Sequence, residues 1–185
     1  MKHIIPIILI SSIFIFFIYK IFNTKEIIIT CIGDSYNYGD IGNGMLGYSY
    51  LDDLANKNIQ INQIKYSKTH LLINNHQYDN IIHKSTYVIV FIGLEELNNI
   101  KTINNEVITT FLNEYNTLIS NIYKLNHNII IINYPNLNND LVYTIINNYI
   151  NGIANNYKIT QINIENSQDY QHEIYYKLTE YLQST

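Results

Sequence analysis

The chain has 185 residues, which is enough for one domain with a sizeable core and too few for two ordinary domains. Its formal net charge is −4, and lysine supplies all of the positive charge because the sequence contains no arginine. Bidentate phosphate contacts and base-edge contacts favour arginine, so this composition argues against nucleic-acid recognition. Cys31 is the single cysteine, which excludes an intramolecular disulfide, and its place in an apolar run predicts a buried structural thiol.

The amino-terminal segment, residues 4–22, is almost entirely apolar, with Lys20 as its one charged residue. About 19 residues at ~1.5 Å each span roughly 28 Å, close to the hydrocarbon thickness of a bilayer. A cleaved secretory signal is the alternative, because Met1-Lys2-His3 gives a short basic start, but no small-x-small cleavage site follows. We therefore expect a transmembrane helix that anchors the chain over residues 1–23, and one folded domain over residues 24–185. Lysines flank the segment on both sides, so its orientation in the membrane stays open.

The first predicted strand, residues 27–32, runs directly into Gly33-Asp34-Ser35-Tyr36-Asn37-Tyr38-Gly39. The apolar strand ends at a glycine, and the serine follows on a tight turn. This arrangement places the serine hydroxyl at the carboxyl edge of a sheet. A serine in that position is available to act as a nucleophile. The alternative is an ordinary turn serine that caps a helix.

The rest of the chain alternates between strand-like and helix-like periodicity, without an internal repeat or a linker. Further strands are predicted over residues 59–66, 86–92, 128–133 and 158–164, and helices over residues 45–56, 106–125, 140–155 and 170–182. Continuous apolar strands separated by helices predict a three-layer α/β/α fold with a five-stranded parallel, doubly wound, flavodoxin-like sheet. Ligands of such sheets bind outside the carboxyl ends of the strands. Ser35 and Gly93 follow the first and third strands, and therefore mark the expected site.

The sequence Asp169-Tyr170-Gln171-His172 stands directly before the apolar pattern of the last predicted helix. An aspartate three residues ahead of a histidine can hold one ring nitrogen and leave the other free to face a serine. Two alternatives compete with this interpretation: His172 as a surface residue of the helix, and Asp169 as the helix N-cap.

The pattern G-D-S-x-x-x-G after the first strand, with D-x-x-H before the last helix, resembles the SGNH/GDSL superfamily of esterases and lipases. The resemblance covers most of the chain from about Lys25 to the end. It implies Ser35 as the nucleophile, His172 as the general base and Asp169 as the carboxylate that orients the imidazole. It also implies structural roles for three loop residues, Gly33, Asp34 and Gly39.

The oxyanion hole is where the sequence departs from that superfamily, which uses the serine amide, a glycine amide after the second strand and an asparagine side chain after the third. The second region contains no glycine, so an amide of Ser67 or Lys68 would have to serve. The third region reads Gly93-Leu94-Glu95-Glu96, with Glu95 in the asparagine position. Glu95 can donate a hydrogen bond only as the neutral acid, and an ionised carboxylate would repel an oxyanion. Two asparagines further along the chain are the alternative donors, Asn98 and Asn99.

The leading interpretation is a membrane-anchored serine esterase that cleaves a small-molecule, lipid or glycan acyl ester through an acyl-serine intermediate. A second interpretation is a membrane-tethered binding domain that keeps the fold without turnover, because the oxyanion motifs diverge. A third, a flavodoxin-like cofactor binder, is disfavoured because Asp34 and Asp40 line the loop that would hold a phosphate. No cofactor is expected. No metal site is expected either, because the other histidines lack carboxylate or cysteine partners at ligand spacing, namely His3, His70, His76, His83 and His127.

The membrane segment can be tested by carbonate extraction of cells that express the full-length chain. We expect the protein to stay in the membrane pellet, because an apolar run of about 19 residues is long enough to hold a helix in the bilayer. A variant that starts at Lys25 is the matched control and should pass to the supernatant. Release of the full-length chain, or a mature amino terminus near Lys25, would contradict the anchor.

Overall fold

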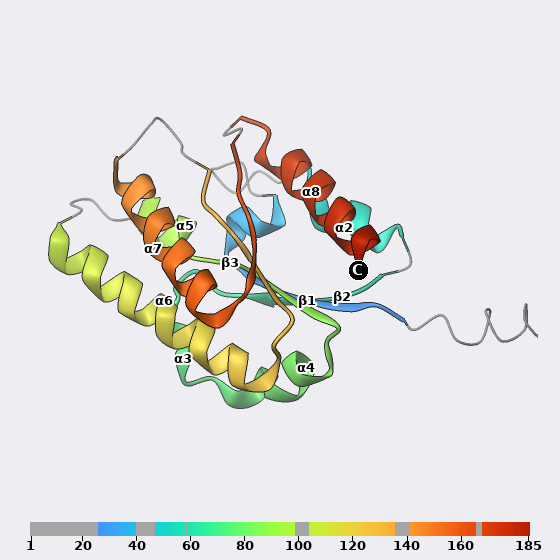
Figure 1. The fold of residues 1–185 in the computed structure, drawn as a ribbon, viewed down its shortest axis with the longest axis horizontal. Helices are drawn as coiled ribbons and strands as arrows, with labels where there is room; N and C mark the ends of the chain where they lie inside the picture. Colours follow the sequence, from blue (N-terminus) through green and yellow to red (C-terminus); the bar gives the residue numbers. More distant parts are fainter. Residues whose placement is uncertain (1–25, 40–46, 58, 99–103, 136–140, 166–167) are drawn as a thin grey trace, which may run out of the picture.

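The structure is a computed structural model that describes residues 26–39, 47–57, 59–98, 104–135, 141–165 and 168–185. Five parallel strands form a single sheet with the spatial order β2-β1-β3-β4-β5 (Figure 1). The strands are β1 (Ile28–Gly33), β2 (Gln60–Lys65), β3 (Tyr87–Phe91), β4 (Ile129–Ile132) and β5 (Thr160–Ile162). The chain winds from β1 to β2 on one side and then through β3 to β5 on the other. This is the flavodoxin-like doubly wound order that the sequence predicts.

Helices cover both faces of the sheet and complete the three layers (Figure 1). On one face α2 packs against α8, and on the other α6 contacts α3, α4 and α7. The helices are α2 (Tyr50–Ala55), α3 (His70–Ile73), α4 (Asp79–Lys84), α5 (Leu94–Asn98), α6 (Asn105–Leu125), α7 (Leu141–Tyr157) and α8 (Tyr170–Ser184). Two short 3₁₀ turns complete the described elements, η1 (Ser35–Tyr38) and η2 (His76–Tyr78).

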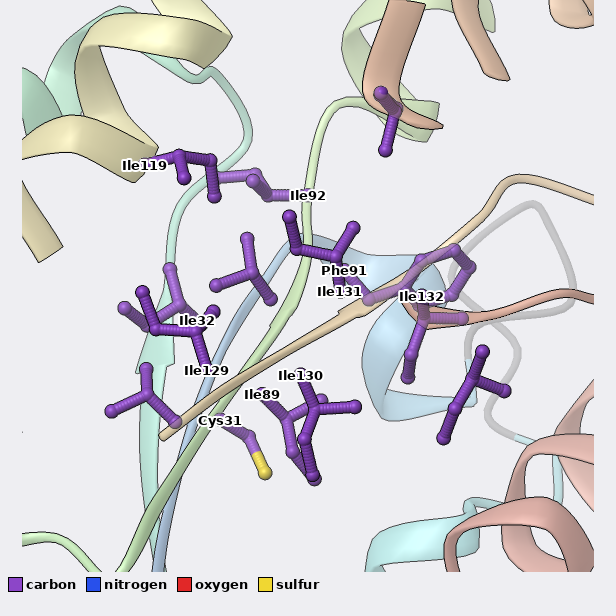
Figure 2. Close-up of a cluster of buried hydrophobic side chains, with 14 of the residues drawn as sticks. Cys31, Ile32, Ile89, Phe91, Ile92, Ile119, Ile129, Ile130, Ile131 and Ile132 are labelled. Atoms are coloured by element: carbon purple, nitrogen blue, oxygen red, sulfur yellow. The ribbon is translucent and has the colours of Figure 1, made fainter. Parts of the chain in front are cut away.

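The core is built mainly from isoleucine side chains of the strands, joined by residues of the helices such as Ile119 of α6 (Figure 2). All of the residues of β4, Ile129–Ile132, are buried, because helices exclude water from both faces of the sheet. Cys31 is buried among these side chains, which confirms the predicted structural thiol. Burial raises the pKa of that thiol well above its ordinary value, so it stays protonated and unreactive.

The register of the central strands brings three strand ends to the same level. Gly33, the last residue of β1, lies opposite Lys65 of β2 and Phe91 of β3. The segments that follow these strands therefore leave the sheet next to one another at its carboxyl edge. This edge is where the sequence predicts the site.

The starts of two elements lie two or more residues later than predicted, because local backbone contacts and geometry set them. The helix predicted over residues 45–56 begins only at Tyr50, since the Ser49 hydroxyl accepts a hydrogen bond from Leu51 N and caps the first turn. The fifth strand begins at Thr160, because Lys158 adopts φ of +55° and closes the end of α7 in a left-handed turn. The helices α3, α4 and α5 were not predicted, since 4 to 6 residues are too few to show a helical period.

The predicted membrane helix, residues 4–22, lies outside the part of the chain that the structure describes. Within the described part, no helix combines the length and the apolar composition that crossing a bilayer requires.

Two buried tyrosines allow a paired stability test of the core. Tyr115 and Tyr134 are 0% and 1% exposed, yet only Tyr134 donates its hydroxyl, to the carbonyl oxygen of Ile92. Among the described residues, the Tyr115 hydroxyl has no hydrogen-bond partner. We expect Tyr134→Phe to lower the free energy of unfolding by about 1–2 kcal/mol, and Tyr115→Phe to leave it unchanged or to raise it, because an unpaired buried hydroxyl is costly. Urea unfolding of both variants checks this, and equal losses would contradict it.

Candidate active site

The turn that carries Ser35 is fixed by the residues on either side of it. After β1, the 3₁₀ turn η1 runs from Ser35 to Tyr38 and ends at Gly39, whose φ is +83°. A Cβ atom at Gly39 would lie 2.7 Å from the carbonyl oxygen of Tyr48, so only glycine fits this return of the chain. Ser35 itself is half-buried at the carboxyl edge of the sheet.

Asp34 joins the loop after β1 to the loop after β3. Its Oδ1 accepts a hydrogen bond from Tyr36 N at 3.1 Å, and its Oδ2 accepts from Gly93 N and Glu95 N, each at 2.9 Å. Only 1% of Asp34 is exposed. Burial raises the pKa of this carboxyl to about 6; the Glu95 charge adds to the rise, and the backbone N–H groups oppose it.

Asp169 and His172 form a contact at the start of α8. The Asp169 Oδ1 lies 2.5 Å from His172 Nδ1, and the Asp169 side chain makes no capping bond to the helix backbone. This geometry favours the orienting role over the N-cap alternative, because a bond at Nδ1 leaves Nε2 as the nitrogen that can face a substrate or a nucleophile. The His172 ring stacks on the Tyr48 ring, with centroids 3.9 Å apart and an angle of 6° between the planes.

Helix α8 is held against the serine turn by its first two residues. The Gln171 Nε2 donates to the carbonyl oxygen of Tyr36 at 2.6 Å, and its Oε1 accepts from Tyr50 N at 3.1 Å. The Tyr170 hydroxyl also donates to the Tyr36 carbonyl, at 3.3 Å. The two predicted motifs, from opposite ends of the chain, therefore meet at one edge of the sheet. Among the described contacts no hydrogen bond joins the Ser35 hydroxyl to the His172 ring, so the contact between nucleophile and base that the resemblance implies is not formed.

The Glu95 carboxylate is hydrogen-bonded to the Ser35 amide, which the resemblance assigns to the oxyanion hole. The Ser35 N–H donates to Glu95 Oε2 at 3.2 Å, so the side chain points into the site and acts as an acceptor. An ester oxyanion would find this donor already engaged by a carboxylate.

The other residues considered for the oxyanion hole are engaged elsewhere or lie at the surface. Gly93 donates its N–H to Asp34, and its φ of +109° permits the sharp departure from β3. Asn98 accepts a hydrogen bond from the Tyr143 hydroxyl of α7. Ser67 is exposed, and Asn99 lies outside the described residues.

The sequence analysis missed two contacts of the site, because each joins residues from separate parts of the chain. Tyr48 stacks on His172, and Gln171, which lies inside the D-x-x-H motif, donates a hydrogen bond to the serine turn. The expectation that the remaining histidines lack carboxylate partners is wrong for His70 and His76. His70 Nδ1 lies 4.0 Å from Oε2 of Glu114, which is far away in the sequence, and His76 Nδ1 lies 3.1 Å from Oδ2 of Asp79.

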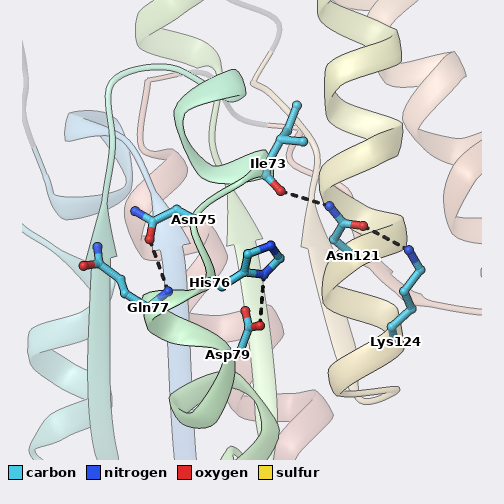
Figure 3. Close-up of polar contacts among 7 residues, drawn as sticks. All are labelled: Ile73, Asn75, His76, Gln77, Asp79, Asn121 and Lys124. Atoms are coloured by element: carbon cyan, nitrogen blue, oxygen red, sulfur yellow. Dashed lines mark hydrogen bonds and ion pairs between the residues drawn. The ribbon is translucent and has the colours of Figure 1, made fainter.

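A separate cavity of about 240 Å³ lies between the sheet and the layer formed by α3, α4 and α6. Its walls are mainly isoleucine and leucine, and its rim carries two polar pairs, His76 with Asp79 and Asn121 with Lys124 (Figure 3). Neither Ser35 nor His172 lines it. It is therefore distinct from the serine site.

Solved structures with a similar fold are esterases and lipolytic proteins. A carbohydrate esterase with divergent catalytic and non-catalytic binding functions has a TM-score of 0.61 and 15% identity, over 88% of this chain and 70% of that one. Esterase EstA from Pseudoalteromonas sp. has a TM-score of 0.57 and 12% identity, over 84% and 98% of the two chains. A G-D-S-L family protein from Desulfitobacterium hafniense DCB-2, described as lipolytic, has a TM-score of 0.58 and 16% identity, over 82% and 94%.

These comparisons establish the architecture. The chain has the three-layer fold of the SGNH/GDSL esterases and lipases, as the sequence resemblance predicts. No family model matches the sequence, and no curated protein matches it either. The roles of individual site residues therefore rest on their chemistry and contacts.

The raised pKa of Asp34 predicts a pH-dependent contribution to stability. The Asp34 carboxyl has a pKa of about 6 in the folded protein and 3.8 in the unfolded chain, so the folded protein binds the proton more tightly. The contribution of this group to the free energy of unfolding is therefore full at low pH and is lost as the pH rises through 6. Relative to Asp34→Asn, wild type should lose up to about 3 kcal/mol of unfolding free energy between about pH 4 and 7, at about 1.4 kcal/mol per pH unit. Urea unfolding across this range measures the difference.

The control for this experiment is Asp52→Asn, which removes an exposed carboxylate from α2. The raised pKa of Asp34 is contradicted if the difference in unfolding free energy between wild type and Asp34→Asn stays constant with pH. It is also contradicted if that difference grows in favour of wild type as the pH rises.

Proposed function

We propose that the protein is a membrane-anchored serine hydrolase that cleaves an acyl ester through an acyl-serine intermediate. Ser35 is the nucleophile, His172 the general base and Asp169 the carboxylate that orients the imidazole. The proposal rests above all on one observation: helix α8 carries an Asp169–His172 pair and is bonded to the turn that carries Ser35. The esterase fold supports it.

The proposed reaction uses each residue in turn. His172 Nε2 takes the proton of the Ser35 hydroxyl as its Oγ attacks the ester carbonyl. The tetrahedral intermediate collapses, the bond to the alcohol breaks, and the proton on His172 passes to the departing alcohol. Water then attacks the acyl-serine with His172 again as the base, which releases the carboxylic acid and restores the free serine. Asp169 stabilises the imidazolium in both halves, through its bond to Nδ1.

The substrate class is an acyl ester of a small molecule, a lipid or a glycan. The similar structures include a carbohydrate esterase and an acetylxylan esterase, which supports a glycan ester as one of these substrates. The proposed anchor over residues 4–22 would hold the domain at a membrane surface, which would suit a lipid or a cell-surface ester.

One observation favours a second candidate function, a binding domain without turnover. The carboxylate of Glu95 accepts the Ser35 N–H, and this bond competes with an oxyanion for the same donor. Losing one such donor lowers the rate by about 10²-fold or more, and a nearby negative charge adds repulsion. A catalytic cycle therefore requires Glu95 to move aside, whereas a binding role does not.

The two functions are separated by esterase assays on short p-nitrophenyl esters. We expect weak hydrolysis by wild type that Ser35→Ala reduces to background. Glu95→Asn should raise the rate by up to about 10²-fold, because it frees the Ser35 amide and removes the repulsive charge. A fluorophosphonate probe should label wild type and not Ser35→Ala. Glu180→Gln, which removes an exposed carboxylate of α8, is the control for the change in charge and should leave the rate unchanged.

Equal background rates for wild type, Glu95→Asn and Ser35→Ala, in folded protein that the probe does not label, would overturn the hydrolase proposal. That result would favour the binding domain.

A further inference from the structure

A cluster of metal-ligating side chains lies outside the serine site. It consists of His70 at the start of α3, Glu96 on α5 and Glu114 in the middle of α6. One ligand atom from each residue lies within 4.8 Å of those of the other two, and His70 Nδ1 is 4.0 Å from Glu114 Oε2. The three residues come from separate elements, so it is the tertiary fold that brings them together.

The cluster faces a hollow of about 340 Å³ that is strongly acidic. One face of α6 forms most of its wall, with Glu106, Thr110 and Glu114 at successive turns. Among the described residues that line the hollow there is no lysine, so His70 is the sole group there that can carry positive charge. The carboxyls of Glu96 and Glu114 are close enough to repel each other. With burial as the larger cause, this repulsion raises the pKa of Glu114, and His70 offsets it in part.

Glu96 is held in position by the backbone. Its Oε2 accepts a hydrogen bond from Thr69 N at 2.9 Å, one residue before His70. This bond ties α5 to the start of α3 and orients the carboxylate. Backbone donors commonly fix ligating carboxylates in this way.

We infer that His70, Glu96 and Glu114 form a binding site for a divalent first-row transition metal ion, with zinc as the best-fitting probe. One imidazole and two carboxylates make a mixed nitrogen and oxygen donor set, which suits zinc better than calcium or magnesium, both of which prefer oxygen alone. Three protein ligands leave a fourth position for water.

The metal-free arrangement is more open than a loaded site. Zinc bonds of about 2.0–2.2 Å place tetrahedral ligand atoms about 3.3–3.6 Å apart, so ligand atoms that are now up to 4.8 Å apart must approach by up to about 1.5 Å. The side chains have room for this, since those of His70 and Glu114 are 45% and 28% exposed. Binding would neutralise the paired carboxylates and cross-link α3, α5 and α6.

The experiment is titration of the full-length, chelator-treated protein in detergent with zinc, followed by calorimetry, and with cobalt, followed by its visible absorption. We expect one site with a dissociation constant below 100 μM, a roughly tetrahedral cobalt spectrum and a higher unfolding temperature with zinc. His70→Ala and Glu114→Gln should each weaken binding at least tenfold and remove the thermal gain. Circular dichroism of the metal-free variants verifies that they are folded.

The matched control is His76→Ala. His76 and Asp79 form a second surface histidine–carboxylate pair of this layer, 3.1 Å apart, but the cluster does not include them (Figure 3). This variant should retain the site at full affinity. The inference is overturned if wild type binds zinc more weakly than 100 μM, or if His70→Ala and His76→Ala weaken binding equally, which would indicate zinc on scattered surface histidines. The experiment measures metal affinity and thermal stability, so its outcome does not depend on whether the protein has esterase activity.

Discussion

The buried carboxylate of Asp34 is the constraint on which the candidate site depends. It accepts hydrogen bonds from the backbone N–H groups of Tyr36, Gly93 and Glu95. These bonds hold the turn after β1 against the start of α5. A second link between the two loops is the hydrogen bond from Ser35 N to Glu95 Oε2. Asp34 thereby helps to position the serine amide, the Glu95 carboxylate and the Tyr36 carbonyl that accepts hydrogen bonds from α8.

In the proposed reaction, this arrangement places two carboxyl groups next to the Ser35 turn, where an ester oxyanion would form. Asp34 is held away from solvent, so its charge is weakly screened. Glu95 adds a second carboxylate directly on the Ser35 amide. The serine and the histidine pair suit acyl transfer, whereas the loop after β3 opposes it. The balance between turnover and binding therefore depends on the position of one side chain on a helix of 5 residues.

The same short helix connects the serine site with the proposed metal site. Glu95 of α5 reaches toward Ser35, and the neighbouring Glu96 reaches toward His70 and Glu114 on the outer layer. The side chains of adjacent helical residues point about 100° apart, so Glu95 and Glu96 can face two sites on different sides of α5. A metal ion held by Glu96 would restrict the movement of α5, and with it the freedom of Glu95 to leave the serine amide.

The sequence by itself determined the succession of strands and helices, the buried thiol and the two motifs, because these depend on apolar periodicity and on residues close together in the chain. A short isoleucine run such as Ile129–Ile132 favours a strand covered on both faces, and the D-x-x-H spacing at the start of a helix brings Asp169 to His172. Only the tertiary structure decided that Glu95 takes the Ser35 amide, that Tyr48 stacks on His172, and that His70 meets Glu114. These contacts join residues from separate elements, and their geometry follows from how the layers pack, which no local pattern encodes.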